Sequence, residues 1–66
     1  MVTALRLERV IKELTQTELS RRTGIPQWRI SLVERGKRPT QEEAAALGAV
    51  FGVDPSALWP GLESQP

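Results

Sequence analysis

The pattern of apolar and polar positions along the chain predicts short helices and no strand. A first helix is expected over residues 3–14, where apolar side chains recur at the i, i+3, i+4, i+7 spacing of one helical face. We expect this face to cover the elements that follow, with Leu5 as a further contact. Its members are Leu7, Val10, Ile11 and Leu14.

The stretch 15–39, TQTELSRRTGIPQWRISLVERGKRP, is predicted to form two short helices joined by a tight turn. Thr15 and Glu18 have the spacing of a capping box, in which each side chain binds the backbone N–H of the other residue, so the first of these helices is expected to begin at Thr15. Gly24 is expected to end it, because glycine adopts the left-handed conformation of a helix terminus without steric cost.

The second helix of the pair is expected to run from about Pro26 to Arg35 and to stop at Gly36. Pro26 favours a helix start because its φ is fixed near the helical value and it has no N–H to leave unpaired. Isolated helices this short are marginal in water, so the pair needs a common core. The residues expected to face that core are Leu19, Ile25, Ile30 and Val33.

Two more helices are predicted in the last third of the chain. Thr40 and Glu43 repeat the capping-box spacing, and the helix they begin is expected to close at Gly52. Asp54 followed by Pro55 indicates the start of a fifth, short helix. The apolar face of the fourth helix consists of Ala44, Leu47, Gly48 and Phe51.

A single all-α domain is therefore expected over 1–66, ordered over about 3–62 with a frayed tail at 63–66. The chain has no Cys and no His, so neither a cofactor, a metal site nor enzymatic activity is expected. Glu42 and Glu43 are better explained as charges at a helix start than as a catalytic pair. With no long apolar run and no secretory signal pattern, the expected location is the cytoplasm, as for a bacterial or phage protein bound to the nucleoid.

The net charge of +1 is less informative than its distribution. Residues 20–39 hold six of the nine cations and a single acid, whereas residues 40–66 hold acids only. Such a cluster is often no more than a solvated face, but here it coincides with the predicted pair of helices, as expected of a surface that binds phosphates. Its cations are Arg21, Arg22, Arg29, Arg35, Lys37 and Arg38.

Several separated features agree: Thr15-Gln16 opening a helix, Glu18-Leu19 within it, Gly24 at the turn, Ile30 and Val33 facing inward, and Glu34-Arg35-Gly36-Lys37 after them. Together they resemble the lambda and 434 repressor and Cro-like (XRE-type) family of helix-turn-helix DNA-binding domains. The resemblance covers roughly residues 5–62. It implies five helices, of which the second and third form the helix-turn-helix. It also implies a sequence-specific transcription regulator, a repressor that binds a palindromic operator as a homodimer with its third helix in the major groove of double-stranded DNA.

The resemblance also implies which side chains meet the duplex. Base edges are expected to face four residues of the third helix: Gln27, Trp28, Arg29 and Leu32. Gln27 suits adenine and Arg29 suits guanine because each makes a bidentate pair, whereas Trp28 and Leu32 can only pack on a thymine methyl or a sugar. Phosphate contacts are expected from Gln16, Arg35, Lys37 and Arg38. One duplex reaches all of them only if Arg29 and the basic loop lie on the same side of the molecule.

Three structural expectations follow from the same resemblance. Arg9 and Glu34 are expected to form an ion pair between the first and third helices, which orients the third helix more than it stabilises the fold. Glu13 stands where many relatives have Gly, so the end of the first helix is expected to differ from theirs. The expected homodimer interface consists of Leu58, Trp59 and Leu62.

A second function of another class is left open by the large apolar residues Trp28 and Leu32. The same fold can serve as a protein-interaction module, such as an antitoxin-like domain, that uses this surface to bind a partner protein. Exchange of both residues for Ala distinguishes the two functions. Loss of partner binding with unchanged DNA affinity would favour the protein-interaction module.

Overall fold

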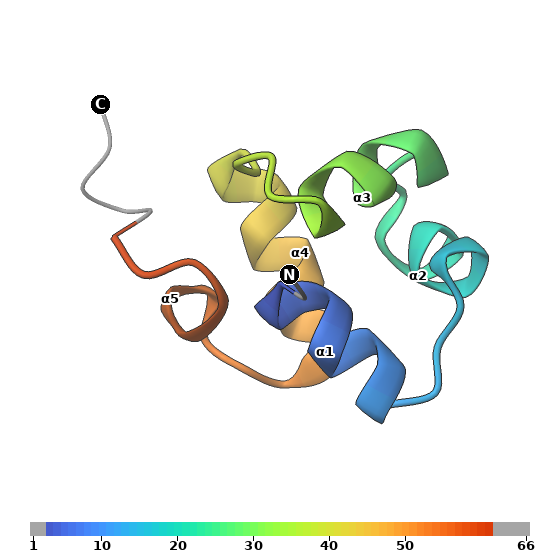
Figure 1. The fold of residues 1–66 in the computed structure, drawn as a ribbon, viewed down its shortest axis with the longest axis horizontal. Helices are drawn as coiled ribbons and strands as arrows, with labels where there is room; N and C mark the ends of the chain where they lie inside the picture. Colours follow the sequence, from blue (N-terminus) through green and yellow to red (C-terminus); the bar gives the residue numbers. More distant parts are fainter. Residues whose placement is uncertain (1–2, 62–66) are drawn as a thin grey trace.

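Five helices follow one another, with no strand, over residues 3–61, the part of the chain that the computed structural model describes (Figure 1). The expected all-α fold is confirmed for these residues, while the expected tail at 63–66 lies outside them. α2 packs against α3 and α4, α1 packs against α3, and α5 packs against α4. The helices are α1 (Ala4–Ile11), α2 (Gln16–Thr23), α3 (Gln27–Glu34), α4 (Gln41–Phe51) and α5 (Pro55–Leu58).

Threonine side chains cap the starts of α2 and α4, where the sequence predicts them. The capping box at the start of α4 is complete: Thr40 Oγ1 accepts from Glu43 N at 3.0 Å, and Glu43 Oε1 accepts from Thr40 N at 2.9 Å. At the start of α2 only half of the predicted box forms. Thr15 Oγ1 accepts from Glu18 N at 3.0 Å, but the Glu18 carboxylate binds two arginines of its own helix instead.

Residues with positive φ mark the ends of α1, α2 and α4. α2 ends at Gly24 with φ 78° and α4 ends at Gly52 with φ 68°, as predicted. α1 ends earlier than predicted, with Lys12 as its C-cap, and is followed by Glu13 at φ 57°. Glu13 is the one non-glycine residue with positive φ in the described part of the chain, a conformation that glycine would adopt with less strain.

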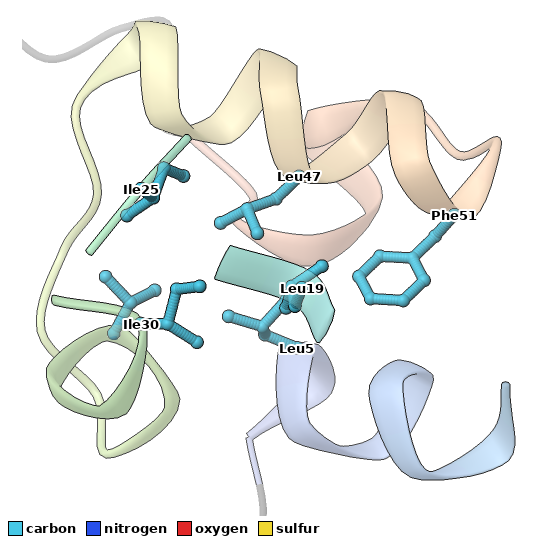
Figure 2. Packing of buried hydrophobic residues seen from close by; sticks show 7 residues of the cluster. Leu5, Leu19, Ile25, Ile30, Leu47 and Phe51 are labelled. Atoms are coloured by element: carbon cyan, nitrogen blue, oxygen red, sulfur yellow. The ribbon is translucent and has the colours of Figure 1, made fainter. Parts of the chain in front are cut away.

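The core lies between α1, α2, α3 and α4, and its side chains converge on Leu19 (Figure 2). All the inward residues predicted for the second, third and fourth helices are buried. Gly48 is needed where α4 meets the next segment, because an added Cβ would lie 2.7 Å from the carbonyl oxygen of Val53. The buried cluster consists of Leu5, Leu19, Ile25, Ile30, Val33, Leu47 and Phe51.

The inward face of α1 was predicted wrongly. Leu7, Val10 and Ile11 are exposed. Leu14, which follows α1, is partly buried and packs against the core as predicted. The side facing the core instead carries Leu5, which is buried, and one turn later a charged residue. α1 therefore covers the helix pair with the opposite face from the one that its apolar spacing indicates.

None of the helices in the described part of the chain combines the length and the apolar character needed to span a membrane.

The matched isoleucines Ile30 and Ile11 test this packing. Ile30 is fully buried, so Ile30→Val should lower the free energy of unfolding by about 0.5–1.5 kcal/mol. Ile11 is exposed, so the same change there should cost less than about 0.5 kcal/mol. Urea unfolding followed by circular dichroism measures both values. Equal losses at the two positions would contradict the packing of α1 described above.

Candidate nucleic-acid interface

α3 presents one side to the core and the other to solvent. Ile30 and Val33 are buried, whereas Gln27 and Trp28 in the first turn are exposed. Trp28 leaves 66% of its surface open and is not part of the core. Leu32, one turn after Trp28, is half-buried. The part of α3 with the greatest access to a partner is thus its N-terminal turn.

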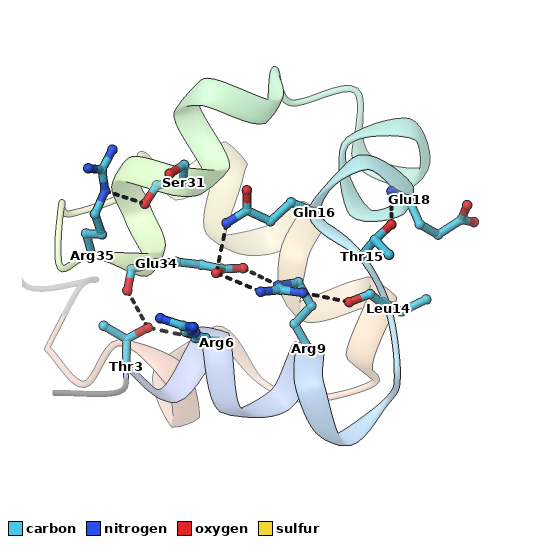
Figure 3. A network of polar contacts seen from close by, with 10 residues as sticks. All are labelled: Thr3, Arg6, Arg9, Leu14, Thr15, Gln16, Glu18, Ser31, Glu34 and Arg35. Atoms are coloured by element: carbon cyan, nitrogen blue, oxygen red, sulfur yellow. Dashed lines mark hydrogen bonds and ion pairs between the residues drawn. The ribbon is translucent and has the colours of Figure 1, made fainter.

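A buried carboxylate ties the C-terminal end of α3 to two other helices (Figure 3). Glu34 is only 5% exposed, and its carboxylate accepts from Arg9 Nε, from Arg9 Nη2 at 3.2 Å and from Gln16 Nε2 at 3.1 Å. Arg9 also donates to the carbonyl oxygen of Leu14 at 2.8 Å, and Thr3 Oγ1 donates to the backbone oxygen of Glu34 at 2.8 Å. The ion pair implied by the resemblance is therefore present, with every buried side-chain N and O atom of residues 3–61 hydrogen-bonded.

A second ion pair holds the N-terminal half of α3 against α4. Arg29 donates from Nε to Glu43 Oε2 at 2.8 Å and from Nη2 to Glu43 Oε1 at 2.9 Å, a bidentate geometry. The hydrogen bonds from Arg29 hold the pKa of Glu43 below its ordinary value, and those to Glu43 raise the pKa of Arg29. The guanidinium of Arg29 is thereby engaged within the protein and is not free to pair with a base while this contact holds.

Arg29 and the basic loop lie on the same side of the molecule, which is what a single duplex requires. Arg29 Nη2 donates to the carbonyl oxygen of Arg38 at 3.3 Å. The side chains of Lys37 and Arg38 are exposed and have no ion-pair partner within residues 3–61. Arg35, also exposed, donates from Nε to the carbonyl oxygen of Ser31 at 3.3 Å. The loop thus offers three cations to phosphate groups.

The two glutamines of the motif bind different partners. The side-chain amide of Gln16 donates to Glu34 Oε1 at 3.1 Å. Gln27 Oε1 accepts from Thr17 Oγ1 at 3.3 Å, and its Nε2 makes no hydrogen bond within residues 3–61. The side chain of Gln27 is therefore oriented by α2 while its donor group remains available.

Sequence reasoning missed the part that Glu43 plays in this surface. The capping-box spacing identified Glu43 as a helix-start residue, and the structure confirms that contact with Thr40. Its second partner, Arg29, is 14 residues away in sequence, and no local pattern indicates the pair. The carboxylate of Glu43 thus caps the start of α4 and also holds α3 in position.

The residues expected at a homodimer interface are placed differently. Leu58 is buried, and Trp59 is half-buried and packs against the core cluster. Leu62 lies outside the residues that the structure describes. No group of three or more acidic residues, His or Cys suited to a metal ion occurs between residues 3 and 61.

Comparison with known proteins gives one match. A family model described as a helix-turn-helix matches residues 5–58. No curated protein and no solved structure matches the chain.

The pair of Arg29 and Glu43 should make stability depend on pH. Because hydrogen bonds from Arg29 lower the pKa of Glu43 in the folded chain, the contribution of this carboxylate is complete above the ordinary value of 4.5 and is lost as the pH falls toward the lower folded value. Glu43→Gln should therefore lower the free energy of unfolding by roughly 1–2 kcal/mol at neutral pH, and this difference from wild type should shrink in acid.

Urea unfolding between about pH 3 and pH 7 measures this difference. Glu42→Gln is the matched control, since the side chain of Glu42 is exposed and has no ion-pair partner in the described chain. A Glu43→Gln loss that stays constant from neutral to acidic pH would show that the pair does not act as described.

Proposed function

The chain belongs to the helix-turn-helix family of the Cro and repressor (XRE) type, a family of DNA-binding, non-enzymatic domains, and on this basis we propose that it is a sequence-specific regulator of transcription. In this proposal α3 lies in the major groove of double-stranded DNA. The chain acts as a repressor that occupies a palindromic operator as a homodimer.

The observation that carries the proposal is the first turn of α3, which combines exposure with rigidity. Gln27 and Trp28 project from a helix whose two halves are tied to α4 and α1 by ion pairs. A helix fits the width of the major groove, and side chains that are already oriented lose less entropy on binding. Contact of the Trp28 side chain with water is unfavourable in the free protein. A duplex that covers this side chain therefore gains hydrophobic free energy on binding.

Base contacts are assigned to Gln27, Trp28 and Leu32. The free Nε2 of Gln27 donates to adenine, while Trp28 and Leu32 pack on thymine methyl groups or sugars. Arg29 is assigned a positioning role instead of a base contact, because its guanidinium holds Glu43 and the carbonyl of Arg38. Direct readout by hydrogen bonds is therefore sparse in each copy.

Phosphate contacts are assigned to the loop and to the beginning of α2. Arg35, Lys37 and Arg38 supply positive charge beside α3. Gln16 is the first residue of α2, where free backbone N–H groups and the helix dipole favour an anion. Contacts of this kind fix the position of the protein on the duplex without reading its sequence.

Two copies are expected on one operator because one copy makes too few base contacts to select a specific sequence. A good bidentate base contact discriminates by roughly 1–3 kcal/mol, and each copy offers few of them. A homodimer on a palindrome doubles the number of contacts.

The exposure of Trp28 also supports the alternative of a protein-interaction module with an antitoxin-like role. In that case the surface of Trp28 and half-buried Leu32 binds a partner protein and does not read bases. Trp28→Ala distinguishes the two functions. In the regulator it weakens DNA binding. In the module it weakens binding of the partner protein and leaves DNA affinity unchanged.

Selection of bound sites from random duplex DNA, followed by binding measurements at several salt concentrations, tests the regulator. We expect a palindromic site and a slope of log affinity against log salt of roughly −7, corresponding to about eight phosphate contacts. Lys37→Ala should weaken binding to all sequences and reduce the slope by about one contact per copy, whereas Gln27→Ala should relax the preference at one base position of each half-site.

Lys12→Ala serves as the control for Lys37→Ala, because Lys12 lies at the end of α1, outside the motif. It should leave both affinity and slope nearly unchanged. A flat salt dependence, or a selection that returns no common sequence, would contradict the proposed function.

A further inference from the structure

α1 carries a cluster of exposed apolar side chains that neither the core nor the proposed DNA interface uses. Leu7, Val10 and Ile11 are 53%, 55% and 60% exposed, and we call these three residues the α1 patch. Apart from Trp28, they are the exposed large hydrophobic residues of the described chain. Single exposed apolar residues are ordinary, but several on one helix face indicate an interaction surface.

The α1 patch points away from the helix-turn-helix. Leu5 and Arg9 define the inward side of α1, since Leu5 is in the core and Arg9 reaches Glu34 at the C-terminal end of α3 (Figures 2 and 3). At 100° per residue, Leu7 lies about 160° around the helix from both of them. A duplex at the N-terminal turn of α3 therefore leaves the α1 patch uncovered.

The two edges of the α1 patch carry opposite charges. Arg6 and Glu8 lie about 100° to either side of Leu7. Neither side chain has an ion-pair partner within residues 3–61. When two copies pair with their α1 helices parallel and related by a two-fold axis, the basic edge of one copy faces the acidic edge of the other. The surface is thus complementary to itself in charge.

We propose that the α1 patch is the surface through which two copies of this chain associate. This inference deepens the proposed function, since it rests on the homodimer and assigns its interface to α1 in place of α5. The α5 residues are less suited, because Leu58 is buried and Trp59 packs against the core. Three half-exposed side chains are far fewer than the residues of a standard interface of about 800 Å² per partner, so association is weak in free solution. Adjacent half-sites on DNA raise the local concentration and complete the dimer.

Sedimentation equilibrium without DNA, at low salt and up to about millimolar protein, tests the surface directly. Glu8→Lys makes both edges of the patch basic, and Arg6→Glu makes both acidic. Each variant alone should associate at least about tenfold more weakly than wild type, while their equimolar mixture should associate at least as tightly as wild type, because every edge then faces its opposite. Circular dichroism should show an unchanged fold, since neither side chain has an ion-pair partner among the described residues.

Ile11→Ser tests the apolar part and should weaken association by about tenfold or more, since burial of Ile11 is lost in both copies. Trp28→Ala is the matched control: it removes the remaining exposed large hydrophobic side chain of residues 3–61, and association should not change. A wild-type chain that stays monomeric at about millimolar concentration, or a mixture of the charge variants that associates no better than either alone, overturns the inference.

Binding to a single half-site, where one copy suffices, separates this inference from the proposed function. Ile11→Ser should bind a half-site as wild type does and lose affinity only on the palindrome. Association through α1 without any DNA binding would leave the inference standing and remove the regulator. Half-site binding with no effect of Ile11→Ser on either association or the palindrome would leave the regulator standing and remove the inference.

Discussion

The buried carboxylate of Glu34 is the constraint on which the arrangement of the other helices depends. A charge with so little access to water is tolerated only when it is paired and hydrogen-bonded, and Glu34 obtains these partners from α1 through Arg9 and from α2 through Gln16. Arg9 must therefore face inward, and Leu5, one turn earlier on the same side, enters the core with it. The exposure of the α1 patch follows from the same contact, because that face is what remains on the outside.

The same reasoning explains why α3 can serve for recognition. Its apolar contacts, Ile30 and Val33, are few for a helix that must keep a fixed direction, and two ion pairs complete the attachment at either half. The pair of Arg29 with Glu43 also reaches the carbonyl of Arg38, so the basic loop and the first turn of α3 are held in one frame. Side chains that read bases and side chains that meet phosphates then approach a duplex together, which reduces the entropy lost on binding.

Local signals in the sequence predicted most of the fold. The caps at Thr15 and Thr40 and the glycine ends at Gly24 and Gly52 depend on neighbouring residues only, and all four were found where expected. The apolar faces of α2, α3 and α4 were also correct. The face of α1 was predicted wrongly, because the periodicity of apolar side chains carries no information about Glu34, which is distant in sequence and requires Arg9 on the inward side. Arg29 shows the same limit, since composition marks it as a cation for DNA, whereas its partner is fixed by tertiary structure.

The central claim is that the pair of Arg9 and Glu34 orients α3 more than it stabilises the fold. Replacement of both residues together, Arg9→Met with Glu34→Leu, measures this directly when unfolding and operator binding are determined on the same protein. Removing one partner alone strands a buried charge and should cost about 3–5 kcal/mol, but the apolar pair should recover the free energy of unfolding to within about 1 kcal/mol of wild type. The account predicts that operator affinity remains at least about tenfold weaker in this double variant, because α3 is no longer held in one direction. Full recovery of both stability and operator affinity would contradict it.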